Sequence, residues 1–101
     1  MPYNVVVNDE VGSRIAAWEI HHTIKMLFYA LLDEELTDGK PNGVPAKDLE
    51  GCVTHRIRLA DPDINSTAVY HFVAVVQTIE NTHRIVDAAY FRKGGPRGLV
   101  L

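Results

Sequence analysis

Cys52-Val53-Thr54-His55-Arg56-Ile57-Arg58-Leu59 is a run in which two sets of side chains alternate. Successive side chains of a β-strand point to opposite faces, so this pattern predicts a strand with two different faces. The set predicted to face a core is Val53, His55, Ile57 and Leu59. The set predicted to face away is Cys52, Thr54, Arg56 and Arg58. An arginine face is either a working surface or an ordinary solvated face, and the pattern leaves both open.

Two further strands are predicted after this one. Residues 68–77 are rich in valine on both faces, which is typical of a central strand. Glu80-Asn81-Thr82 predicts a turn, and residues 83–91 predict the third strand. The second half of the chain therefore reads as a three-stranded antiparallel meander.

The first half of the chain changes from a strand pattern to a helical one. Residues 3–7 are short and β-branched, which predicts an N-terminal strand. Residues 10–36 place apolar side chains at spacings of three and four, and residues 13–37 contain neither Gly nor Pro. This segment is either one long helix or a helical hairpin whose break the pattern does not locate. The sequence thus predicts a single α+β domain over residues 1–101, with the order strand, long helix or helical hairpin, meander.

Composition narrows the function classes. The net charge is −3, which argues against binding nucleic acid through bulk charge but permits a local basic patch. The chain has one cysteine, so no internal disulfide can form, and its histidines lack the spacing of a zinc site. No signal peptide is visible, and no apolar run approaches the length needed to cross a membrane. We expect a cytoplasmic protein with no membrane association, no metal and no cofactor.

The order of elements and several short motifs resemble the RelE/ParE superfamily of bacterial toxins. Members commonly carry a Leu-x-Gly element before an Arg-x-Arg strand, matched here by Leu49-Glu50-Gly51 and Arg56-Ile57-Arg58. Their last strand ends in aromatic and basic residues, matched by Tyr90-Phe91-Arg92-Lys93. Many members have an arginine where this chain has Thr67. The resemblance implies a RelE/ParE-like fold and a toxin of a type II toxin–antitoxin module, neutralised by a cognate antitoxin.

The resemblance also implies how such a toxin would act. It would inhibit translation by metal-independent RNA cleavage, with the ribosome as a possible partner, or poison a topoisomerase. The residues expected to converge on one concave surface as the catalytic set are Arg56, Arg58, Tyr90 and Arg92. Lys93 and His83 are expected to bind substrate, His83 because it sits beside a turn. His55 and His71 lie in apolar alternations, so the prediction for both is a hydrogen-bonded core histidine.

A second function class fits the same residues. A non-enzymatic binding or regulatory protein of plasmid or phage type could use this fold through protein–protein contacts, including self-association. Burial of the arginine–tyrosine cluster in a dimer would favour this class, and an open groove would favour the toxin.

Overall fold

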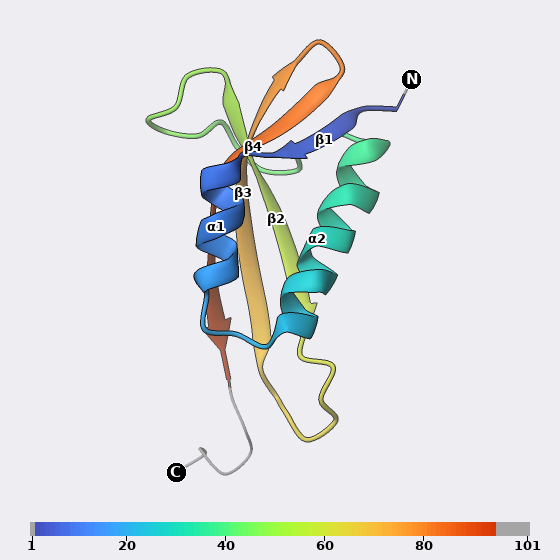
Figure 1. Cartoon of the computed structure of the whole chain (residues 1–101), viewed down its shortest axis with the longest axis vertical. Coiled ribbons are helices and arrows are strands. Elements are labelled where there is room, and N and C mark those ends of the chain that lie inside the picture. Colours follow the sequence, from blue (N-terminus) through green and yellow to red (C-terminus); the bar gives the residue numbers. More distant parts are fainter. Residues whose placement is uncertain (1, 95–101) are drawn as a thin grey trace.

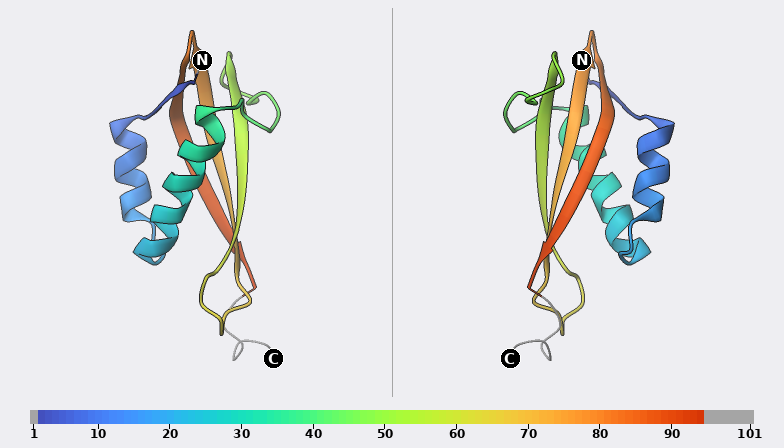
Figure 2. Two further views of the ribbon diagram at one scale, coloured as in Figure 1. Left: turned by 90° about the vertical axis from the view of Figure 1, so that its right-hand side faces the viewer. Right: turned by 90° about the vertical axis from the view of Figure 1, so that its left-hand side faces the viewer.

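A four-stranded mixed sheet with two helices packed on one face makes up the fold (Figures 1 and 2). This is a computed structural model, and it describes residues 2–94. The strands are β1 (Asn4–Val7), β2 (Cys52–Ala60), β3 (Val69–Ile79) and β4 (Thr82–Lys93), in the sheet order β1-β4-β3-β2. The helices are α1 (Asp9–Ala17) and α2 (His22–Thr37). The predicted α+β class is confirmed.

Strand pairing follows the alternation seen in the sequence. β2 pairs antiparallel with β3, and β3 pairs antiparallel with β4, so the three C-terminal strands are neighbours in chain order. β1 adds to the outer edge of β4 in parallel, from Asn4 opposite Thr82 to Val7 opposite Ile85. β1 covers only the first third of β4, and the rest of that edge has no partner strand among the described residues.

The helical segment is a pair of helices with a break at residues 18–21. Trp18 leaves the helix with an extended backbone at ψ 135°. His21 then caps α2, because its Nδ1 accepts a hydrogen bond from the Thr23 N–H at 3.1 Å. Lys25 Nζ donates to the Ala16 carbonyl at 2.7 Å and ties the two helices together. The extended backbone of Trp18 ends α1 and the His21 imidazole caps the start of α2, so the break needs no Gly or Pro and the sequence did not locate it.

The core lies between the helices and the sheet. Ile24, Phe28, Leu32 and Leu36 form a stripe of α2 that is fully buried. The sheet contributes further buried side chains from all three long strands: Ile57, Tyr70, Phe72, Ala74, Val76, Ile85 and Ala88. Phe28 stacks on Phe72 with ring centroids 4.3 Å apart, at the centre of this contact.

The predicted faces of β2 are largely confirmed. Ile57 and His55 are buried, Leu59 packs against the core, and Arg56 and Arg58 are exposed. Cys52 differs from the prediction, because it is 6% exposed although it shares parity with the arginines. Its carbonyl accepts from the Ala46 N–H at 2.8 Å, and its own N–H donates to the Leu49 carbonyl at 3.1 Å. The loop before β2 thus folds back onto the strand and covers the thiol.

Ile57→Ala should lower the free energy of unfolding by about 2–5 kcal/mol, because it leaves a cavity in the core. Arg58→Ala, one residue away on the exposed face, should cost less than about 0.5 kcal/mol. Chemical denaturation of both variants measures the difference. Equal losses would contradict the assignment of the two faces.

Candidate functional site

The face of the sheet opposite the helices carries the candidate site. Figure 2 shows both helices on one side of the sheet and none on the other. Directly paired residues point to the same face, and Arg58 of β2 pairs with His71 of β3, which pairs with Phe91 of β4. One row up the sheet, Arg56 pairs with Val73. These side chains line a depression of about 250 Å³ on what we call the open face.

Aromatic side chains form the floor of the open face. The imidazole of His71 stacks on Phe91, with centroids 4.7 Å apart and planes 8° apart. The Lys93 ammonium lies 5.8 Å from the centroid of Phe91, within range of a cation–π contact. Phe91 is 50% exposed, so a flat apolar ring remains available to a ligand.

Charge on the open face is positive. Two ion pairs are present in residues 2–94, Arg14 with Asp87 and His55 with Glu35. Neither involves Arg56, Arg58 or Lys93, so within this part of the chain their charges have no carboxylate partner. Unpaired guanidinium groups side by side are suited to bidentate contacts with phosphate or carboxylate oxygens.

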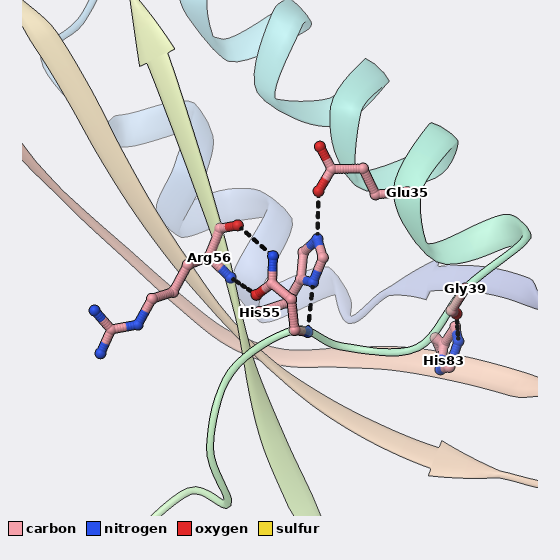
Figure 3. A network of polar contacts seen from close by, with 6 residues as sticks. Glu35, Gly39, His55, Arg56 and His83 are labelled. Carbon is pink, nitrogen blue, oxygen red and sulfur yellow. Dashed lines mark hydrogen bonds and ion pairs between the residues drawn. The ribbon is translucent and has the colours of Figure 1, made fainter.

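The loop before β2 fixes the backbone of Arg56. The Asn42 side chain donates from Nδ2 to the Arg56 carbonyl at 2.9 Å and accepts from the Arg56 N–H at 2.7 Å (Figure 3). One side-chain amide thus satisfies both edge groups of this residue, as a neighbouring strand would. Figure 3 also shows the Arg56 side chain pointing away from α2, on the opposite side of β2 from His55.

His55 is a structural residue, as predicted. It is 2% exposed, and its Nδ1 accepts from the Asn42 N–H at 3.2 Å. That bond assigns the proton to Nε2, which donates to Glu35 Oε1 at 2.8 Å. Both ring nitrogens are therefore engaged, and they connect α2, the loop and β2 (Figure 3).

His83 is buried, contrary to the prediction that it lies exposed and binds substrate. It is 0% exposed, although it adjoins the turn between β3 and β4. Its Nε2 donates to the Gly39 carbonyl at 2.8 Å, its Nδ1 accepts from the Thr78 hydroxyl at 2.7 Å, and Tyr3 stacks on the ring. The loop after α2 and the N-terminal segment cover a position that sequence reasoning placed in solvent.

The four predicted catalytic residues do not converge, so that expectation is wrong. Tyr90 pairs with Phe72 and Arg92 pairs with Tyr70, and both of these partners are buried on the helix side. Tyr90 also contacts Trp18, with ring centroids 4.8 Å apart. The sheet thus separates Tyr90 and Arg92 from the two arginines of β2.

Sequence reasoning missed two residues of the open face. His71 was predicted to be a core residue, but it is partly exposed, lines the depression on the open face and pairs directly with Arg58. Phe91 was read as part of a terminal motif without a role of its own. That His71 lies opposite Arg58 follows from the register between β2 and β3, which the residue pattern of either strand alone does not give.

Other chemistry finds little support in residues 2–94. No group of three or more His, Cys, Asp or Glu side chains there could hold a metal ion. Neither described helix is long and apolar enough to cross a membrane. Burial raises the pKa of Tyr29, which lies on α2 and so on the other side of the sheet from the open face.

Comparison with known proteins found no matching family model, no matching curated protein and no matching solved structure.

Asn42→Ala should lower the free energy of unfolding by about 1–2 kcal/mol, because it removes two hydrogen bonds to the β2 edge. Alanine keeps the backbone N–H that His55 accepts, so the effect isolates the side chain. Faster hydrogen exchange at the Arg56 amide should accompany the destabilisation. Lys40→Ala, an exposed change in the same loop, is the control and should fall within about 0.5 kcal/mol.

Proposed function

We propose that this chain is a toxin of a type II toxin–antitoxin module and that its open face binds RNA. The supporting observation is the unpaired Arg56 and Arg58 beside the stacked His71–Phe91 pair. Single-stranded RNA is recognised by cations along its backbone and by aromatic rings on which its bases stack. The open face offers both within one depression.

The resemblance of the motifs supports the same proposal. The Arg-x-Arg element falls on the middle of an exposed strand face, where both guanidinium groups can reach one phosphate. The order β1-α1-α2-β2-β3-β4 agrees with what the resemblance implies for a RelE/ParE-like fold. A cognate antitoxin would neutralise the toxin by binding it.

His71 is the residue we assign to acid–base chemistry. In metal-independent RNA cleavage the 2′-oxygen attacks phosphorus and the bond to the 5′-oxygen breaks, leaving a cyclic phosphate. His71 would take the proton of the 2′-hydroxyl, and water would protonate the departing 5′-oxygen. Arg56 and Arg58 would offset the charge that develops on the phosphoryl oxygens. Phe91 would hold a base by stacking.

A non-enzymatic binding protein is the second candidate. Its support is that Tyr90 and Arg92 lie away from the open face, so within residues 2–94 His71 is the one acid–base side chain that lines the depression with the two arginines. Such a protein would bind RNA without cleaving it. A topoisomerase target would instead leave RNA binding absent while growth arrest persists.

Arg56→Ala and Arg58→Ala should each weaken binding of a short single-stranded RNA about tenfold, because each removes charge-assisted hydrogen bonds to phosphate. The slope of log affinity against log salt should fall by about 0.7 for each phosphate that the variant no longer neutralises. Fluorescence anisotropy at several salt concentrations measures both. Lys47→Ala, an exposed cation in the loop before β2, is the matched control and should change neither.

His71→Phe should strongly slow RNA cleavage while keeping RNA binding, because phenylalanine preserves the stack on Phe91 but cannot carry a proton. The rate should fall on the order of 10²–10⁴, as loss of a general base does. Cleavage assays with and without ribosomes, together with growth of a bacterial host, provide the readout. Binding without cleavage by the wild type would select the non-enzymatic candidate, and a fully active His71→Phe variant would exclude the assigned role.

A further inference from the structure

A second cavity lies on the helix side of the sheet, at the end where the α1–α2 turn meets the loop after β2. Figure 1 shows these two connections at the same end of the molecule. The cavity has a volume of about 390 Å³. Its walls come from the start of α2, the loop after β2 and the start of β3: His21, Thr23, Ile24, Asp61, Pro62, Asp63 and Tyr70. Among the described residues, it shares no lining residue with the depression on the open face.

Tyr70 contributes a polar residue to the wall of this cavity. The residue is only 6% exposed, and within residues 2–94 nothing forms a hydrogen bond with its hydroxyl. No fully enclosed side-chain oxygen or nitrogen in this part of the chain lacks a partner, so the hydroxyl must reach accessible space. Because it is accessible and has no partner within residues 2–94, the hydroxyl can form a hydrogen bond with a group that enters the cavity.

Two carboxylates give the cavity its charge. Asp61 Oδ1 accepts from the Asp63 N–H at 3.0 Å, and Asp63 Oδ1 accepts from the Asn65 N–H at 2.9 Å. Within the described residues, the Oδ2 atom of each carboxylate has no hydrogen-bond partner, and neither carboxylate pairs with a cation. The first amides of α2 are not available to an anion in this cavity, because His21 already accepts from the Thr23 and Ile24 N–H groups.

We propose that this cavity binds the guanidinium or ammonium group of an arginine or lysine side chain of a partner protein. The carboxylates of Asp61 and Asp63 would accept its N–H donors, and the Tyr70 hydroxyl would accept one more. Ile24 and Pro62 provide apolar surface for the aliphatic stem of such a side chain.

Ile64 favours a protein partner over a free amine. It lies between Asp63 and Asn65 in the same loop and is 94% exposed. An apolar side chain held this far into solvent beside a charged cavity matches an interface in which an anchoring cation is flanked by apolar contacts. Binding of a cation here does not require RNA binding, because the cavity and the open face lie on opposite sides of the sheet.

The test is a titration of the full chain, followed by backbone amide NMR, with the peptide acetyl-Ala-Leu-Arg-Leu-Ala-amide. Shifts should concentrate at residues 21–24 and 61–70. The matched peptide with citrulline in place of arginine keeps the shape but loses the charge, and should bind at least tenfold more weakly. Absence of shifts at these residues, or equal binding of the citrulline peptide, would overturn the proposal.

Variants locate the interaction. Asp61→Asn and Asp63→Asn keep the side-chain oxygens that hold the loop and remove only the charge, so each should weaken arginine-peptide binding about tenfold or more. Tyr70→Phe removes only the hydroxyl and should cost about three- to tenfold. Asp48→Asn, an exposed carboxylate in the loop before β2, is the control and should bind as the wild type does. If it weakens binding as much as Asp61→Asn, the effect is bulk charge and the site is not specific.

A second probe separates the two sources of the cation. Agmatine carries the guanidinium group on an aliphatic chain without flanking residues. It should bind more weakly than the peptide, and Ile64→Ala should weaken peptide binding while leaving agmatine binding unchanged. Agmatine binding as tightly as the peptide, together with no effect of Ile64→Ala, would reject a protein partner and assign the cavity to small amines.

Discussion

One extra residue in β4 determines which side chains reach each face of the sheet. Val75 pairs with Asp87 and Val76 pairs with Ile85, so Val86 has no partner on β3 and forms a β-bulge. A one-residue offset reverses the face of every side chain beyond it. Before the bulge, the odd-numbered residues His83 and Ile85 face the helices. After it, the even-numbered residues do, beginning with Ala88.

The bulge explains how much of the site could be read from the sequence. The alternation of β2 placed Arg56 and Arg58 correctly, because no irregularity interrupts that strand. The same reasoning could not place the end of β4. A regular strand running on from His83 would put Tyr90 and Arg92 on the open face, whereas the bulge turns them towards the helices and brings out Phe91 and Lys93 instead.

The fold was more predictable than the site, for physical reasons that differ between elements. Helical spacing and strand alternation report which side of an element is buried, so the element types and the α+β class followed directly. Burial of a residue by segments distant in sequence cannot be read from the residues around it. His83 is covered by Tyr3 and by the Gly39 carbonyl, and Cys52 by the loop at residues 46–49. These contacts join positions far apart in sequence, and only the assembled sheet brings them together.

The acidic net charge of the chain hides a separation of charge between its layers. On the open face, β2 carries Arg56 and Arg58 and β4 carries Lys93, whereas Arg92 of β4 lies on the helix side. Many of the acidic residues lie instead on the helices and loops: Asp9, Glu10, Asp33, Glu34, Glu35, Asp61 and Asp63. Screening at physiological salt limits the reach of exposed charges to about 8 Å, so a ligand on the open face responds mainly to the local cations. The carboxylates of Asp61 and Asp63 line the second cavity, on the helix side of the sheet. One thin sheet can therefore present a cationic surface on one side and an anionic cavity on the other, and net charge alone argues against neither.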